Sequence, residues 1–384
     1  MKYQRLVIIY LVCSFALFLY SYTQVDLNLT LSRASILQTI QKAFQYLGYY
    51  QRPLSTIIYL LILGLLFTAY GWLLCLIKQN LIRHQGLWRL IFLVTGILVL
   101  SYPAFSYDFF NYMFTAKTVL VYHKNPYLVI PQQFWAIDPW VNFMRWIHLP
   151  SAYTPLWIGL TLLPYLLGFG YFLLIMWNIK LLVAGFYLLT VWGLEKVLEK
   201  TNPQQKTLGL AIFALNPLII IESLVSGHND IVMMALVAWS IYFFLEKKKW
   251  LSVLVWAFSV AAKLMTVFIL PVFLLASKKT VNWRVWSLVA MMIGFTLVCL
   301  QREVLPWYWV WIMPFIALLP AKHQLTKLAA AVSLGLLLRY APYLYYGHWD
   351  NPVPLMKIYL TWIPIIFCII YLIIKSRVIK RHEI

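Results

Sequence analysis

The sequence is poor in acidic residues and in charge of any kind. Of its 384 residues only 11 are Asp or Glu, charged residues make up 11%, and hydrophobic residues make up 63%. A soluble core cannot bury so much apolar surface, so the composition excludes a soluble globular protein and predicts an all-α polytopic membrane protein. Because no low-complexity linker or soluble domain interrupts the pattern, residues 1–384 are expected to form a single multi-pass membrane domain.

Cysteine is also scarce. The four cysteines stand singly in or beside apolar segments, without CxxC spacing and without paired histidines: Cys13, Cys75, Cys299 and Cys368. This pattern indicates neither a disulfide framework nor a metal site. No P-loop and no nucleophile triad occurs. We therefore predict no cofactor and no metal ligands; a divalent cation is chemically compatible but not indicated.

Positive charge is the only charge in excess, at a net +20. In a soluble protein it would suggest a nucleic-acid partner. Here most Lys and Arg lie in short clusters between apolar runs, as in cytoplasmic loops, so membrane lipids are the expected counterions and no nucleic acid is expected. The clusters at both ends predict a plasma (cytoplasmic) membrane protein with both termini cytoplasmic. The first apolar run lacks a cleavage pattern after Tyr22 and is expected to stay as a span.

About ten to twelve apolar segments are long enough to cross the membrane or to re-enter it. Between residues 155 and 193 the charge rule requires an odd number of crossings, so we expect 155–167 to be short, tilted or re-entrant. Residues 251–275 should form a hairpin of two half-length legs, with Lys263 near its outer tip or buried in protein. The remaining predicted spans are 6–22, 53–77, 90–105, 208–225, 231–245, 285–300, 311–319, 328–346 and 355–374.

The longest connection, residues 106–153, is placed outside the cytoplasm by this orientation. Asp108 stands where an apolar run ends, and Asn111, Thr115 and Thr118 then recur at helical spacing opposite apolar residues. This pattern predicts a helix lying in the membrane interface. Asp108 is accordingly either a functional carboxylate or an ordinary acid at a helix start.

A second group of polar residues lies in the expected outer turn 226–230. His228, Asn229 and Asp230 follow one another between two apolar helices. Either at least one of them faces inward, where it needs a partner, or Asn229 or Asp230 caps the following helix. Arg302, at another outer end, either joins a site or extends to lipid headgroups.

Several different short motifs follow one another along the chain. They are Ser106-Tyr107-Asp108-Phe109-Phe110-Asn111-Tyr112, Asn125-Pro126-Tyr127, Ser151-Ala152-Tyr153-Thr154-Pro155-Leu156, Gly227-His228-Asn229-Asp230, Lys263 with Pro271, and Pro306-Trp307-Tyr308. In this order they resemble the GT-C class of membrane glycosyltransferases, most closely the polyprenol-phosphomannose-dependent mannosyltransferases. Two departures stand out: Tyr107 replaces the first of the paired acids, which argues against a two-carboxylate metal site, and Thr154 replaces a second proline.

The resemblance implies a GT-C-like bundle with 106–153 as a large outer catalytic loop. It implies inverting transfer of a hexose, by analogy mannose, from a polyprenyl-phosphate donor to a lipid or glycan acceptor on the extracytoplasmic face. Asp108 would be the general base, and Lys263 would face the donor phosphate. Arg302 or Arg339 could also stabilise that phosphate, and aromatic rings could stack on sugar or anchor the loop. The substrate-binding candidates are His228, Asn229, Asp230, Lys263, Arg302, Tyr153, Trp307, Tyr308 and Arg339.

Two other classes fit parts of the same pattern. A transporter or lipid flippase also needs buried charges and broken helices, but it should show internal repeats, and none is visible. A non-catalytic partner in a membrane complex is a third reading, which the polar residues at the outer ends disfavour.

Overall fold

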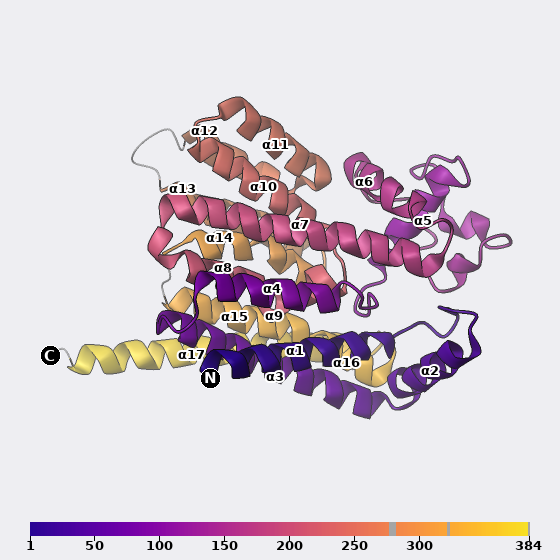
Figure 1. Cartoon of the computed structure of the whole chain (residues 1–384), viewed down its shortest axis with the longest axis horizontal. Coiled ribbons are helices and arrows are strands. Elements are labelled where there is room, and N and C mark those ends of the chain that lie inside the picture. The colour runs from indigo at the N-terminus through magenta and orange to yellow at the C-terminus, as the bar shows by residue number, and fades with distance from the viewer. Residues whose placement is uncertain (276–281, 321–322, 383–384) are drawn as a thin grey trace.

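A computed structural model describes residues 1–275, 282–320 and 323–382 (Figure 1). All regular elements within these residues are helical. In chain order they are α1 (Lys2–Tyr22), α2 (Ser35–Gln45), η1 (Tyr46–Tyr50), α3 (Arg52–Lys78), α4 (His84–Leu98), α5 (Asp108–Leu120), η2 (Pro131–Phe134), η3 (Pro139–Asn142), α6 (Pro155–Leu166), α7 (Phe172–Thr201), η4 (Pro203–Gln205), α8 (Lys206–Ala214), α9 (Pro217–Ile219), η5 (Ile220–Val225), α10 (Asp230–Leu245), α11 (Lys249–Ala262), η6 (Leu264–Ile269), α12 (Leu270–Leu275), α13 (Trp283–Gln301), η7 (Pro306–Trp311), α14 (Met313–Leu318), α15 (His323–Leu338), α16 (Tyr340–Tyr346) and α17 (Val353–His382).

Six helical segments of the described chain are long and apolar enough to cross a membrane, which supports a polytopic membrane protein. They are α1, α3, α7, α13, the α15–α16 segment and α17. A seventh is obtained if Pro203–Ala214 and Pro217–Val225, bent by 52°, count as one broken span. Shorter apolar helices accompany these candidates, namely Pro155–Leu166, Asp230–Leu245, Lys249–Ala262, Leu264–Leu275 and Pro306–Leu318. The expected count of ten to twelve crossing or re-entrant helices stays a prediction.

Two predicted spans are wrong in length. The helix expected over 90–105 ends at Leu98, and the following chain reaches Pro103, whose ring disfavours helical backbone in the residue before it. The span expected over 311–319 is a 3-10 turn followed by a helix of six residues, Met313–Leu318. Both segments are too short to cross the hydrocarbon core as α-helices.

Two irregular predictions are confirmed. Residues 155–193 supply the short helix α6 and the long helix α7, so a single full-length span follows a partial one. The hairpin also forms, with Lys263 at the junction of α11 and η6. Its two legs are joined by hydrogen bonds, because Trp256 Nε1 donates to the Thr266 carbonyl at 2.9 Å and the hydroxyls of Ser259 and Thr266 lie 2.9 Å apart.

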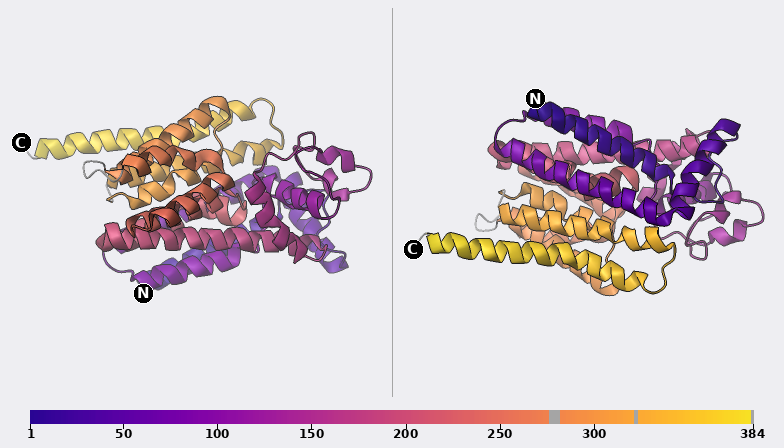
Figure 2. Two further views of the ribbon diagram at one scale, coloured as in Figure 1. Left: turned by 90° about the horizontal axis from the view of Figure 1, so that it is seen from above. Right: turned by 90° about the horizontal axis from the view of Figure 1, so that it is seen from below.

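The long segment 106–153 and both chain ends lie at opposite ends of the bundle. Figures 1 and 2 show α2, α5 and α6 at one end, while the N- and C-termini point toward the other. The expected helix after Asp108 is present as α5, and its position in the membrane interface stays a prediction. Its polar residues Asn111, Thr115 and Thr118 are all buried, as are most of its apolar ones, so the polar side of α5 packs against protein rather than facing water.

The centre of the molecule is the broken segment from α8 to α10. Nearly every residue from Gly209 to Ala235 is buried, including Asn216, Glu222 and the turn 226–230. The break occurs at Asn216-Pro217, where the Asn216 side chain accepts a hydrogen bond from the Leu218 amide at 2.9 Å and starts a new helix. After this change of direction the chain reaches the turn 226–230, where Gly227 lies against Phe109 of α5.

Candidate functional site

Asp108 begins helix α5 and is partly buried. The Ser106 hydroxyl accepts a hydrogen bond from the Asp108 amide at 3.2 Å, which fixes the start of the helix. Burial raises the pKa of the Asp108 carboxyl to about 6, the positive charge of Lys263 opposes that rise, and the negative charge of Asp230 adds to it. A carboxylate that titrates just below neutral pH is well suited to accept a proton at physiological pH.

The turn 226–230 packs directly against α5. Gly227 has φ +72°, and a Cβ at this position would lie 2.7 Å from the ring of Phe109. Glycine is therefore required both by the backbone conformation and by the close approach. The Asn229 side chain contacts the Tyr112 hydroxyl at 3.5 Å. Through these contacts the turn is held beside the first turn of α5.

Asp230 faces inward and is paired. Lys263 Nζ donates to Asp230 Oδ1 at 2.7 Å, and the indole N–H of Trp311 donates to the same oxygen. Asp230 Oδ2 is buried without a hydrogen-bond partner among the described residues. Asn229 occupies the N-cap position of α10, but its side chain makes no capping hydrogen bond. The inward-facing alternative for this turn is therefore the one that the structure shows.

His228 is buried between an aromatic ring and an acid. Its imidazole stacks on Trp307, with ring centroids 4.0 Å apart and an interplanar angle of 21°. Its Nε2 lies 3.4 Å from Glu222 Oε2. Burial and the nearby positive charge of Lys263 lower the pKa of His228 well below its usual value, so the imidazole is neutral.

Two more predicted motifs reach the same place. Tyr153 packs edge to face on Tyr112 at 4.7 Å between centroids, and the Asp108 charge adds to the burial that raises the pKa of the Tyr153 hydroxyl. The Thr154 hydroxyl donates to the Ala262 carbonyl at 3.0 Å, one residue before Lys263. Lys263 also lies over the rings of Tyr308 and Trp311, at 5.9 and 5.4 Å. The Asp108 cluster, defined as Asp108, Tyr153, His228, Asp230 and Lys263 with their aromatic neighbours, thus draws on five separate segments.

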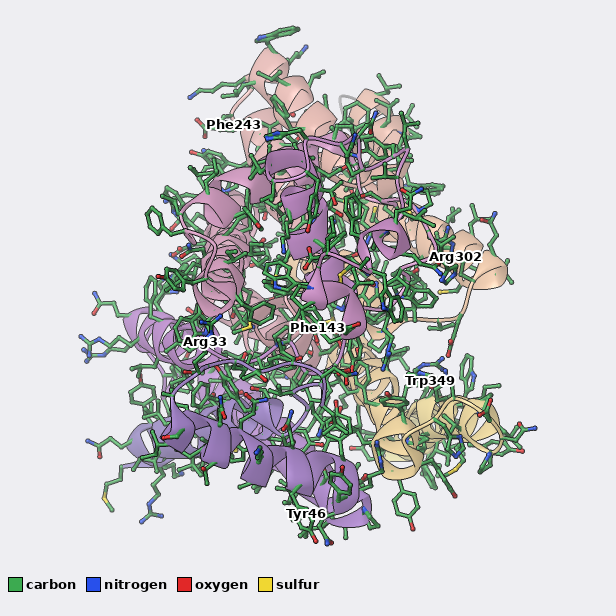
Figure 3. The ribbon with its side chains drawn as sticks, turned by 90° about the vertical axis from the view of Figure 1, so that its right-hand side faces the viewer. Arg33, Tyr46, Phe143, Phe243, Arg302 and Trp349 are labelled. Carbon is green, nitrogen blue, oxygen red and sulfur yellow. The ribbon has the colours of Figure 1, made fainter. Side chains whose placement is uncertain are left out.

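The two predicted arginines lie differently. Arg302 is exposed and interacts with the Tyr308 hydroxyl, and Figure 3 shows it at the edge of this end of the molecule, with Phe143 nearer the middle. Arg339 donates to Thr361 Oγ1 at 3.0 Å and pairs with Glu303, which also binds Lys357. Arg302 therefore borders the Asp108 cluster, whereas Arg339 belongs to an ion-pair group between α13, α15 and α17.

Several contacting residues escaped the sequence prediction. Tyr112 and Trp311 end or follow the quoted motifs but were indistinguishable there from other membrane aromatics. Lys180, inside the apolar run of α7, is buried and donates to the Val225 carbonyl at 2.7 Å, the Leu224 carbonyl and the Ser101 hydroxyl. It thereby fixes the backbone just before the turn 226–230. A lysine within an apolar run is a detectable signal, but its partners are set only by the fold.

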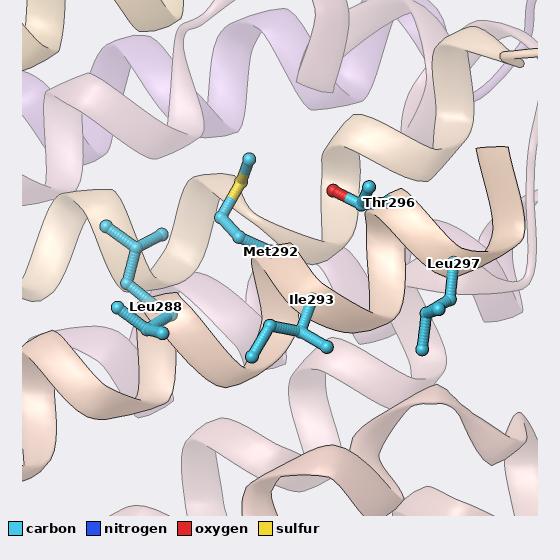
Figure 4. Close-up of a pocket in the computed structure, with 6 residues that line it drawn as sticks. Leu288, Met292, Ile293, Thr296 and Leu297 are labelled. Atoms are coloured by element: carbon cyan, nitrogen blue, oxygen red, sulfur yellow. The ribbon is translucent and has the colours of Figure 1, made fainter. Parts of the chain in front are cut away.

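The described residues hold no candidate metal cluster, and an apolar pocket lies apart from the Asp108 cluster. Within the described residues, no group of three or more His, Cys, Asp or Glu side chains is arranged to hold a metal ion. A pocket of about 410 Å³ is present on α13 (Figure 4). Its lining is almost entirely apolar and comes from Leu288, Val289, Met292, Ile293, Thr296 and Leu297. This pocket is distinct from the Asp108 cluster.

Comparison with known proteins finds a matching family. The family described as alpha-(1->6)-mannopyranosyltransferase, N-terminal domain (MptA_B family), matches residues 12–279. The matched region contains Asp108, Tyr153, the turn 226–230 and Lys263, whereas Trp307 and Trp311 lie beyond it. No curated protein and no solved structure matches the chain.

Proposed function

The chain belongs to the alpha-(1->6)-mannopyranosyltransferase family and is a multi-pass membrane mannosyltransferase, and from this premise we propose that it takes mannose from a polyprenyl-phosphate-linked donor and transfers it to a lipid or glycan acceptor. The observation that carries the proposal is the convergence of Asp108, Asp230 and Lys263 within the matched region. A donor that stays in the bilayer needs an enzyme whose site can be reached from the bilayer, and helix α5, which begins with Asp108, lies at one end of the helix bundle (Figure 1).

Asp108 acts as the general base in this proposal. The acceptor hydroxyl gives its proton to the Asp108 carboxylate while its oxygen attacks the anomeric carbon of mannose. The bond from that carbon to the phosphate oxygen breaks, and its electron pair leaves with the polyprenyl phosphate. A positioned base of this kind contributes about 10²–10⁴-fold to the rate. The raised pKa of Asp108, about 6, supports the assignment because the group is ionised at neutral pH yet more basic than an exposed aspartate.

Lys263 stabilises the leaving phosphate. Its ammonium is held by Asp230 Oδ1 at 2.7 Å and lies over two aromatic rings, so it is positioned before substrate arrives. Charge that develops on a phosphate oxygen beside such a fixed cation is stabilised strongly, because a site with little water screens it weakly. Arg302, exposed next to Tyr308, is placed to add a second positive charge at the rim.

The stereochemistry follows from a single displacement. Attack on the anomeric carbon opposite the leaving phosphate inverts its configuration. If the product carries the alpha linkage of the family's description, the donor must be a beta-linked mannosyl phosphate. The extracytoplasmic location of the reaction rests on the distribution of Lys and Arg, which marks the end that holds the chain termini as cytoplasmic.

The test is a transfer assay with purified protein in lipid nanodiscs. Radiolabelled polyprenyl-phosphate mannose is supplied with a membrane lipid extract or a mannose oligosaccharide, and products are separated and digested with linkage-specific mannosidases. We expect mannose transfer with an alpha linkage. If folded protein transfers no sugar from mannose, glucose or arabinose donors, the proposal fails and a transporter or flippase becomes the better interpretation. A lipid-translocation assay, with the protein reconstituted in vesicles of the same lipids, then tests that interpretation.

A further inference from the structure

Glu222 is an acid at the centre of the protein with no role in the mechanism above. It lies in the π-helical segment η5, on the broken span that leads to the turn 226–230, and its relative exposure is 0%. A buried carboxyl within a membrane segment is costly and is retained where it has a specific partner. Single π-helical turns also occur frequently at functional sites.

Each carboxyl oxygen of Glu222 lies beside a polar side chain. Oε1 accepts a hydrogen bond from the Tyr340 hydroxyl at 2.9 Å. Oε2 lies 3.4 Å from His228 Nε2, and both atoms are buried without a hydrogen-bond partner in the described part of the chain. The His228 amide donates to the Glu222 carbonyl at 3.0 Å, so the backbone of the turn itself fixes the two side chains opposite each other.

We propose that Glu222 is a positioning residue that sets the orientation and the tautomer of His228, so that the imidazole presents a protonated Nδ1 to the oxygens of the sugar phosphate. This inference rests on the proposed function, since it assigns a task to His228 in that site. The tautomer of a histidine is set by the hydrogen bond that its other nitrogen makes. Here Glu222 Oε2 lies 3.4 Å from Nε2 and both atoms lack another partner among the described residues, so we assign this hydrogen bond to Glu222; Trp307 holds the face of the ring by stacking.

The direction of the hydrogen bond follows from the cost of buried charge. No cation among the described residues pairs with Glu222; its polar neighbours are Tyr340, Ser226 and the neutral His228. An unpaired carboxylate in an apolar interior costs far more than a neutral carboxyl that makes hydrogen bonds. Glu222 therefore carries a proton on Oε2 and donates it to His228 Nε2, which leaves the ring proton on Nδ1.

Nitrogen NMR tests this arrangement without turnover. The protein is labelled with ¹⁵N-histidine in nanodiscs, and the His228 signals are identified by their loss in His228→Gln. Wild type should show protonated Nδ1 and unprotonated Nε2. Glu222→Gln should keep this pattern, because its amide still donates to Nε2, whereas Glu222→Leu should lose it. An unchanged tautomer in Glu222→Leu, or the opposite tautomer in wild type, overturns the inference.

Kinetics supply the second arm. Removal of a residue that hydrogen-bonds to a metal-bound histidine typically costs about 10–100-fold; by analogy we expect a loss of that size in kcat for Glu222→Leu and a change of only a few-fold for Glu222→Gln. Equal losses in both variants, in protein that melts like wild type, contradict the inference. The matched control is Glu199→Leu, which should leave kcat unchanged. Glu199 lies near the C-terminal end of α7 and pairs with Lys196 and Lys206.

The two proposals fail in different ways. If wild type transfers no mannose while the NMR pattern is as expected, the proposed function is wrong and the positioning of His228 by Glu222 stands as a structural fact. If wild type transfers mannose but the tautomer does not respond to Glu222→Leu, the inference is wrong and the proposed function stands.

Discussion

Asp108 and Asp138 lie in the same segment, 106–153, and the fold treats them in opposite ways. Asp138 is buried and fully engaged: it pairs with Lys117 at 2.7 Å, accepts from the Tyr122 hydroxyl at 2.8 Å and accepts from the Trp140 amide at 3.0 Å. The Asp108 carboxyl receives no hydrogen bond from the described residues, although it lies within electrostatic reach of Lys263. A saturated carboxylate holds structure together, whereas one left unsaturated beside a cation is available for chemistry.

Asp108→Asn tests most directly whether Asp108 acts in catalysis rather than in holding the structure together. The amide cannot accept the acceptor proton, so we expect mannosyl transfer to fall by about 10²–10⁴-fold, measured as initial rate with the labelled donor. Folding should not suffer. Burial raises the pKa of Asp108 from 3.8 to about 6, so ionisation above that pH costs folded-state stability, and an uncharged Asn removes this cost.

Its matched control is the thermal melting curve of the same variant. A melting temperature at or above that of wild type at pH 7.5, together with the lost rate, supports the base role. Near-normal turnover in Asp108→Asn would remove this residue from catalysis and make its carboxyl comparable to that of Asp138.

Asp138→Asn should give the reverse result. It leaves Lys117, whose side chain is 16% exposed, without its ion-pair partner; breaking a fully buried pair typically costs about 3–5 kcal/mol, which is an upper bound for this partly buried one. We expect a clearly lower melting temperature and an unchanged transfer rate per folded molecule. Asp138→Asn with Lys117→Met removes both charges and should recover part of the loss. A normal melting temperature with a lost rate would place Asp138, too, in the chemistry.

The cation beside Asp108 gives a smaller effect. Lys263→Ala removes the ammonium that the proposal assigns to the donor phosphate, and hydrogen bonds to charged groups are worth about 1.5–3 kcal/mol. We therefore expect donor use, measured as kcat/KM for the labelled donor, to fall by at least about tenfold, and Lys263→Arg to retain more of it. Equal activity in wild type and both variants would mean that Lys263 only neutralises Asp230.

The pH profile gives the smallest and most specific effect. Because the base must be ionised, kcat/KM should decrease as the pH falls through about 6, the raised pKa of Asp108. Lys263 lowers this pKa, so in Lys263→Arg the decrease should stay near the same pH, while in Lys263→Ala it should move to higher pH. An acidic limb that does not move in Lys263→Ala would show that another group controls it.

Part of the site could be predicted from sequence because its residues are rare. Asp108, the turn 226–230 and Lys263 stand out as polar groups in an apolar chain, and their motifs occur in a fixed order. The signal fails where polarity is ambiguous. Asn111, Thr115 and Thr118 form a polar stripe that resembles the wet side of an interfacial helix, yet all three are buried, because α6, α7 and the rest of the segment cover α5.

Arg339 and Glu222 also show that the sequence does not reveal the partners of a charged side chain. Arg339 carries the charge that a phosphate site needs, but its fork binds Glu303 and Thr361. Glu222, an acid inside an apolar run, contacts both His228 and Tyr340, and Tyr340 is 118 residues away in the chain. Side-chain partners at such separations depend on how helices pack, and periodicity within one helix carries no information about them.

By itself the sequence determined that this protein lies in a membrane and that its ionisable groups are few. In apolar runs of membrane length the backbone must satisfy its hydrogen bonds within helices, because lipid offers no partners. Ionisable side chains are rare in these runs, because burying a charge in the membrane is costly. Only the tertiary structure decided which of those groups meet. The break at Asn216-Pro217 and the close contact of Gly227 with Phe109 place His228 and Asp230 beside α5, because a buried polar group must find its hydrogen-bond partners wherever the packed helices put them.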